Sequence, residues 1–179
     1  MSMTTLQPSV PAPGRGVKAP EITRDIYGMP AFATLLVADI DATVSWYTDG
    51  LGFINLFTIP GPDGAAALVH LRRWRFQDLL VRPSSGPVNL GSGPTLSFAA
   101  VYDEVEELAD RARAHRGGIV DGPVDTPWNT RDLTTTDPDG NVVIFTAGLP
   151  PELMDAGFSG QMDRWNSEQG LPSATDEGR

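Results

Sequence analysis

One order of elements, a strand, a helix and three further strands, is predicted twice along the 179 residues of this chain. The helices are predicted to begin near Asp39 and Asp103, whose carboxylates can accept hydrogen bonds from the first helical amides. Asp103 and Glu106 have the spacing of a capping box. The predicted strands are 32–37, 53–59, 65–73 and 76–82, then 95–101, 119–124, 131–136 and 142–147. This recurrence predicts an α+β fold of two tandem βαβββ modules.

Composition divides the chain into four parts. Residues 1–29 are rich in proline and glycine and predict a flexible arm. The two modules are predicted at 30–83 and 94–148, on either side of a loop rich in serine, glycine and proline. Residues 149–179 form a C-terminal tail, predicted to be partly disordered. Apolar side chains in this tail could dock on the protein's own surface, dock on a partner subunit, or form a flap over a pocket.

The composition excludes several classes of site and partner. The chain contains no cysteine and two histidines, so disulfides and thiolate metal sites are impossible. A formal net charge of −10 disfavours nucleic-acid binding, and it favours a cationic small molecule or simply keeps the protein in solution. We find no apolar segment long enough to cross a membrane and no signal peptide, so we expect a cytoplasmic protein without membrane or nucleic-acid partners.

The turn and strand at 137–145 identify a family resemblance. Asp137-Pro138-Asp139-Gly140 predicts a tight turn that leads into alternating apolar residues. This segment resembles the last strand of the vicinal oxygen chelate superfamily, which includes glyoxalase I, extradiol dioxygenases and bleomycin-resistance proteins. Further similarity lies at 37–41, 46–47, 51–53 and 127–131, so the resemblance covers residues 30–148. It implies that the two modules form a curled mixed sheet around a cavity.

The resemblance also shows where metal ligands would lie. In metal-dependent members, the cavity faces of four strands carry the ligands. The matching positions here are Phe32, Leu80 (or its neighbour Leu79), Ser97 and Ile144. Divalent cations need nitrogen, carboxylate oxygen or sulfur donors, which this set does not supply. We therefore predict a protein with no metal and no cofactor.

Without a metal site, the chain is similar to the drug-binding branch of the family, whose members are metal-free dimers with ligand grooves between subunits. The resemblance implies a homodimer that sequesters a hydrophobic or aromatic natural product such as an antibiotic, with cationic groups tolerated. Aromatic side chains would stack on such a ligand. Trp74 could instead lie at the dimer contact. The predicted ligand-binding residues are Phe32, His70, Trp74, Phe76, Ser97, Trp128 and Ile144.

Three alternatives remain open from the sequence. The first is a metal-independent enzyme of the lyase or isomerase type, in which His70 or Asp78 transfers a proton. The second is a regulatory or assembly protein whose cavity holds no ligand. The third is a metal-dependent glyoxalase or dioxygenase, which would require a different strand alignment. The sequence also leaves open whether the modules pair within one chain or between subunits.

Overall fold

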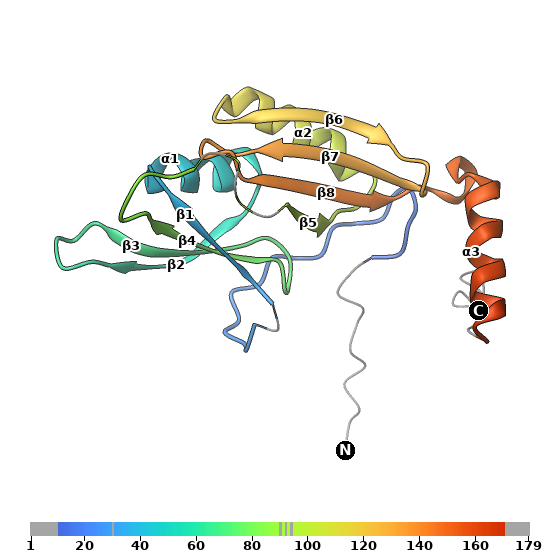
Figure 1. The fold of residues 1–179 in the computed structure, drawn as a ribbon, viewed down its shortest axis with the longest axis horizontal. Coiled ribbons are helices and arrows are strands. Elements are labelled where there is room, and N and C mark those ends of the chain that lie inside the picture. The colour runs from blue at the N-terminus through green and yellow to red at the C-terminus, as the bar shows by residue number, and fades with distance from the viewer. Residues whose placement is uncertain (1–10, 30, 90, 92, 94, 171–179) are drawn as a thin grey trace, which may run out of the picture.

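The computed structural model describes residues 11–29, 31–89, 91, 93 and 95–170, and it contains the two predicted βαβββ modules (Figure 1). The first comprises β1 (Ala33–Val37), α1 (Ile40–Ser45) with a π-helical turn η1 (Trp46–Gly50), β2 (Ile54–Pro60), β3 (Ala66–Arg72) and β4 (Asp78–Pro83). The second comprises β5 (Leu96–Ala99), α2 (Glu104–His115), β6 (Ile119–Asp125), β7 (Thr130–Thr136) and β8 (Val142–Gly148). The predicted fold class is confirmed.

Each module forms its own mixed sheet. The strand orders are β1-β4-β3-β2 and β5-β8-β7-β6, with the first strand of each module parallel to the last. Strands β1 and β5 are therefore both edge strands. The curled mixed sheet that the resemblance implies consists of two four-stranded sheets within this chain. The modules meet instead through their helices and sheet faces, which share one hydrophobic core.

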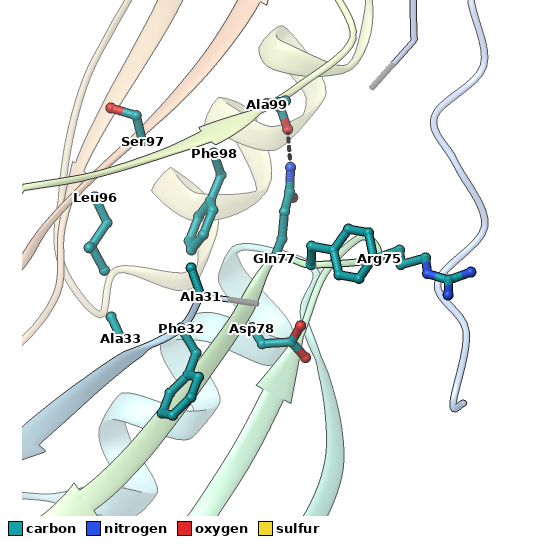
Figure 2. Close-up of a pocket in the computed structure, with 11 residues that line it drawn as sticks. Ala31, Phe32, Ala33, Arg75, Gln77, Asp78, Leu96, Ser97, Phe98 and Ala99 are labelled. Atoms are coloured by element: carbon teal, nitrogen blue, oxygen red, sulfur yellow. Dashed lines mark hydrogen bonds between the residues drawn. The ribbon is translucent and has the colours of Figure 1, made fainter. Parts of the chain in front are cut away.

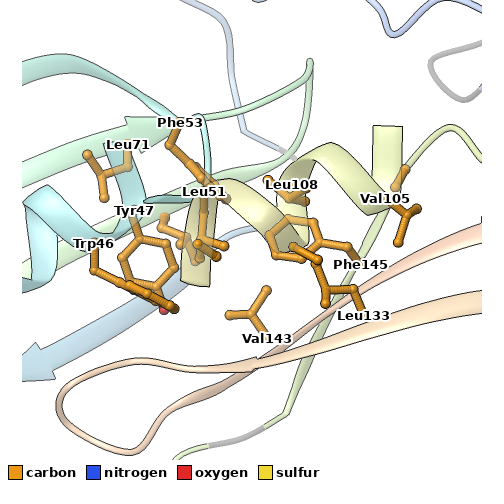
Figure 3. Packing of buried hydrophobic residues seen from close by; sticks show 14 of the residues in the cluster. Trp46, Tyr47, Leu51, Phe53, Leu71, Val105, Leu108, Leu133, Val143 and Phe145 are labelled. Carbon is orange, nitrogen blue, oxygen red and sulfur yellow. The ribbon is translucent and has the colours of Figure 1, made fainter. Parts of the chain in front are cut away.

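The shared core explains why the helices have their apolar patterns. Trp46, Tyr47 and Leu51 of the first helical segment are fully buried. They pack in one cluster with Leu108 of α2 and Phe145 of β8 (Figure 3). Full burial of one such side chain contributes roughly 1.5–3 kcal/mol.

The two predicted helix caps differ in outcome. The Asp39 carboxylate accepts a hydrogen bond from the Ala42 amide at 3.0 Å, as predicted. Asp103 makes no side-chain bond to its helix, so the predicted capping box is wrong. A capping residue needs extended backbone, whereas Asp103 has helical angles (φ −75°, ψ −18°). Its carboxylate accepts a hydrogen bond from the Gly16 amide instead, at 2.6 Å.

Residues 11–29, which we call the strap, contain no helix or strand yet contact both modules (Figure 1). The Gly16 amide reaches the second module at Asp103, and Arg24 donates to the carbonyl oxygen of Asn55 in β2. Tyr27 reaches Asp78 in β4. The predicted flexibility of the arm stays a prediction for these residues, and for residues 1–10 it lies outside the described part of the chain.

The turn between β7 and β8 binds the first module through two buried aspartates. Asp139 accepts hydrogen bonds from the Ala38 amide at 2.9 Å and the Thr43 hydroxyl at 3.1 Å. Asp137 accepts one from the Tyr47 hydroxyl at 3.2 Å. Burial raises the pKa of Asp137, although its hydrogen-bond donors, Asn141 first, act in the opposite direction. Burial and the nearby charge of Asp137 raise the pKa of Tyr47 well above its ordinary value.

The described part of the tail forms a 3-10 turn, η2 (Pro151–Leu153), and α3 (Ala156–Glu168). Buried Asn129 holds the start of this helix, because its side chain accepts from the Asp155 amide at 2.6 Å and donates to the Ser159 hydroxyl at 3.1 Å. No residue of α3 is buried, and the helix projects beside the sheets (Figure 1). Docking on a partner and closure as a flap stay predictions. None of the helices described is long and apolar enough to cross a membrane.

Candidate functional site

A cavity of about 420 Å³ lies between the two modules, where the start of β1 and the β3–β4 turn face β5 (Figure 2). Its lining is mostly apolar, with a few polar groups. The lining residues are Ala31, Phe32, Ala33, Arg75, Phe76, Gln77, Asp78, Leu96, Ser97, Phe98 and Ala99. A volume of this size and an apolar lining with few polar groups are typical of small-molecule sites.

The apolar wall is formed by residues of both edge strands. Leu96 and Phe98 project from β5 toward Ala33 and Ala31, while Ser97 lies on the opposite face of that strand (Figure 2). Phe32 is 51% exposed, so its ring is open to a ligand or to another surface. Because the two modules each supply part of the wall, the cavity depends on how the modules dock.

The docking beside the cavity is fixed by the β3–β4 turn. The carbonyl oxygen of Ala99 accepts hydrogen bonds from Gln77 Nε2 at 2.9 Å and from Arg73 Nη1 at 2.7 Å (Figure 2). The other terminal nitrogen of Arg73 pairs with Glu104 of α2 at 2.7 Å. Burial lowers the pKa of Arg73, while Glu104 opposes that change. The first module thus binds the end of β5 through the buried guanidinium of Arg73.

A buried charged group adjoins the polar end of the cavity; we call Tyr27, His70, Arg72 and Asp78 the Asp78 cluster. One carboxylate oxygen of Asp78 accepts from His70 Nε2 at 2.7 Å and from Arg72 Nε at 2.8 Å. The other accepts from the Tyr27 hydroxyl at 2.7 Å. His70, Arg72 and Asp78 are all almost completely buried. Since a carboxylate only accepts hydrogen bonds, His70 holds its proton on Nε2 toward Asp78.

The predicted site residues fall into three groups. Phe32, Phe76 and Ser97 line the cavity, together with Asp78. His70 lies behind Asp78 and its ring meets Phe57 of β2 edge-on at 5.0 Å. The described cavity lining does not include the other three predicted residues, whose ligand contacts stay predictions.

Each of those three residues has a different surrounding. Trp74 is 1% exposed and packs against the Arg73 guanidinium at 4.4 Å. Trp128 is 53% exposed and lies between β6 and β7. Ile144 of β8 pairs in register with Ser97 of β5. Ile144 and Ser97 therefore lie side by side in the second sheet.

The positions at which the family carries metal ligands do not fit a metal. Phe32, Leu80 and Ile144 have no donor atom in their side chains, and a single serine hydroxyl does not complete a coordination shell. Among the described residues, no group of three or more acidic or histidine side chains is arranged to hold an ion. No chemical step is therefore assigned to a metal at this site.

Sequence reasoning missed several residues of the site. Phe98 and Gln77 line the cavity, and Arg72 and Tyr27 complete the Asp78 cluster. The signal that could have found Arg72 is strand alternation, which places it on the same face of β3 as His70. The only signal for Tyr27 was an aromatic side chain within a proline- and glycine-rich arm, and nothing in the sequence indicates where that ring docks.

The fold and cavity define a two-module βαβββ protein with a mostly apolar cavity between its modules. The chain belongs to the Glyoxalase/Bleomycin resistance protein/Dioxygenase superfamily, which matches residues 30–145. Solved structures agree with the fold. TioX from Micromonospora sp. ML1 is 24% identical over 68% of this chain and 100% of its own, with a TM-score of 0.54.

A second similar structure is the fosfomycin resistance protein FosX from Listeria monocytogenes. It is 15% identical over 69% of this chain and 95% of its own, with a TM-score of 0.54. An integron cassette protein from the mobile metagenome of the Halifax Harbour sewage outfall is 24% identical over 68% of this chain and 99% of its own, with a TM-score of 0.52. At these identities the likeness concerns the fold. No curated protein matches the sequence significantly.

Proposed function

We propose that this protein binds an aromatic, hydrophobic small molecule without a metal and sequesters it, as a resistance protein does, in the cytoplasm. The observation that carries this proposal is the apolar cavity between the modules, with Phe32 and Phe98 in its lining. The positions of the family's metal ligands hold residues that cannot coordinate an ion. Membership of a superfamily that includes bleomycin-resistance proteins supports the same role.

A thermal-shift screen tests the proposal. Divalent metals would be paired with a panel of glycopeptide, enediyne and quinone antibiotics, because binding to the folded state raises the melting temperature. Stabilisation by one drug class with no response to metal is expected. Elemental analysis of the purified protein should find no stoichiometric nickel, zinc, manganese or iron. One metal ion per chain, or stabilisation by metal alone, would contradict the proposal.

Phe32→Ala should lower the affinity for the ligand found in that screen about tenfold, or about 1.4 kcal/mol of binding free energy, because the burial and stacking of the ring are lost. Trp165→Ala is a matched control, since both side chains are half exposed (51% and 52%) and Trp165 lies on α3, away from the cavity lining. Affinities would be measured by calorimetry. Equal affinities for the two variants would remove Phe32 from the site.

We propose further that the working form is a homodimer. The first sheet and the residue before it expose four apolar side chains, Phe32, Leu36, Phe57 and Ile59, which are 40% to 55% exposed in the single chain. A second copy could cover these side chains and enclose the ligand. Sedimentation equilibrium should give twice the chain mass of 19.2 kDa. A monomer at micromolar concentration would contradict the dimer without excluding binding in the cavity.

The contact between His70 and Asp78 favours one second candidate, a metal-independent lyase or isomerase. In that case Asp78 or His70 would move a proton of the bound molecule. Both oxygens of Asp78 are already engaged by three donors, which favours a fixed binding group over a proton carrier. Mass spectrometry of the recovered ligand distinguishes the two, because an unchanged ligand supports sequestration and an altered one supports the enzyme.

A further inference from the structure

We propose that the Tyr27 side chain occupies a subsite for a phenolic ring, and that a ligand bearing such a ring takes its place. The inference rests on the proposed function and deepens it by naming the ligand class. The subsite adjoins the cavity, because Asp78, Phe76 and Arg75 contact Tyr27 and also line the cavity. The strap would then be a built-in occupant that the ligand displaces.

The hydrogen bonds around the Tyr27 hydroxyl select a hydroxyl group. The hydroxyl oxygen accepts a hydrogen bond from the Phe76 amide at 2.7 Å, and the hydroxyl donates one to the Asp78 carboxylate at 2.7 Å. A group that fits both partners must accept one hydrogen bond and donate another. An ammonium group cannot accept, an ether cannot donate, and a carboxylate would be repelled by Asp78. A hydroxyl on an aromatic ring satisfies all of these conditions.

The surroundings of the ring select an aromatic group. The Arg72 guanidinium lies 4.2 Å from the Tyr27 ring centroid, and that of Arg75 lies 5.4 Å from it. The Phe76 ring meets it edge-on at 5.1 Å between centroids. Cations over the face and an aromatic edge at the side both favour an electron-rich ring. The same groups would hold the ring of a phenolic ligand.

The backbone of the subsite is held in an unusual conformation. Phe76 has φ +68°, in the left-handed region that side-chain-bearing residues rarely adopt. This conformation presents its amide to the Tyr27 hydroxyl. Backbone strain of this kind is concentrated at binding sites, where the surrounding structure maintains it. The donor for the phenolic oxygen therefore belongs to the turn between β3 and β4 and not to the strap.

The strap is bound at the subsite through contacts that a ligand can replace. Arg72 Nη1 donates to the carbonyl oxygens of Asp25 at 2.7 Å and Thr23 at 3.3 Å. A carbonyl or carboxylate beside the phenol of the ligand could accept these bonds instead. The Thr23 hydroxyl is buried and has no hydrogen-bond partner among the described residues, which disfavours the docked strap. The ligand is thus a phenol that carries a neighbouring oxygen acceptor.

The test uses the full chain and 4-methylphenol, which reproduces the tyrosine side chain. Tyr27→Ala empties the subsite and should bind 4-methylphenol at least tenfold more tightly than the wild type, by calorimetry. The control ligand 4-methylanisole cannot donate a hydrogen bond and should bind this variant at least tenfold more weakly. Equal affinity of variant and wild type for 4-methylphenol, or equal affinity of the variant for the two ligands, would overturn the proposal.

Tyr27→Phe keeps the ring and serves if Tyr27→Ala fails to fold, as judged by circular dichroism. It loses the hydroxyl that competes with the ligand, so it too should bind 4-methylphenol more tightly than the wild type. In wild-type protein labelled with 3-fluorotyrosine, the chain's three tyrosines give three fluorine signals, and the Phe variant identifies that of Tyr27. An added phenol should shift this signal; an unchanged Tyr27 signal at saturating phenol would count against displacement.

The two proposals fail in different ways. If an antibiotic binds but its affinity is the same for Tyr27→Ala and wild type, and 4-methylphenol binds neither, the subsite is wrong and the proposed function stands. If 4-methylphenol fills the emptied subsite while no antibiotic in the panel binds, the subsite stands and the proposed function fails.

Discussion

The two modules insert corresponding turns into one another, but the turns carry opposite charge. The β3–β4 turn of the first module brings Arg73, which donates to the Ala99 carbonyl at the end of β5. The β7–β8 turn of the second module brings Asp139, which accepts from the Ala38 amide just after β1. Both side chains are buried. The two modules therefore contact each other at corresponding turns, but the charge of the buried side chain and the direction of its hydrogen bond are opposite in the two turns.

This difference shows what the interface requires. A guanidinium can only donate, so Arg73 must meet acceptors, the Ala99 carbonyl and Glu104. A carboxylate can only accept, so Asp139 meets an amide and a hydroxyl. The arginine has a charged partner, whereas the aspartate is held by neutral donors alone. Loss of the arginine should therefore be the more damaging of the two, since it also leaves a carboxylate without its partner.

Arg73→Met should have the largest effect. The substitution keeps much of the side-chain volume but removes the donors to Ala99 and the partner of Glu104, so we expect a loss of about 3 kcal/mol in the free energy of unfolding. Urea unfolding measures it. Arg164→Met, at an exposed position on α3, is the control and should change stability by about 0.5 kcal/mol or less. A loss no larger than the control's would show that the charged turn does not hold the modules together.

Asp139→Ala should come second, with a loss of about 2 kcal/mol, because the Ala38 amide and the Thr43 hydroxyl lose their acceptor. The first module offers a matched control in the exposed turn at 61–64. There Asp63 accepts only from the Ala65 amide, so Asp63→Ala should cost about 0.5 kcal/mol. A result in which both substitutions cost the same would break the comparison, since burial between modules would then make no difference.

The smallest effect should be a pH dependence that belongs to the acidic turn. The folded state raises the pKa of Asp137, so the stability from this group is fully present below its unfolded pKa, about 3.9, and is lost as pH rises through the folded value. The stability of wild type relative to Asp137→Asn should therefore fall as pH rises from 3 toward neutral. Urea unfolding across this range measures it. If the stability difference between wild type and Asp137→Asn stays constant or grows as the pH rises, Asp137 does not contribute to the pH dependence in this way.

Much of the fold could be predicted from the sequence, because strand alternation and helix caps are local signals. Asp39 caps the first helix as predicted, and the strands and helices follow the predicted order. The docking of the modules could not be predicted, since it depends on contacts such as Arg73 to Ala99 that join residues far apart in sequence.

The same limit explains the outcome for the site. Phe32 and Ser97 were predicted because family positions identify them, and both line the cavity, as does the predicted Phe76. Trp74 follows β3, and its apparent place on the strand face ends where the turn buries it. Tyr27 lies in a segment without periodicity, so no local pattern could indicate its partner Asp78.

The distribution of the four tryptophans has an optical consequence. Trp46 and Trp74 are at most 1% exposed, whereas Trp128 and Trp165 are 53% and 52% exposed. Iodide should therefore quench only part of the native fluorescence, and urea should make all of it accessible. The inner pair reports on the integrity of the two modules, and the outer pair reports on any surface that comes to cover the β6–β7 turn or α3. The protein thus carries separate intrinsic probes for unfolding and for association.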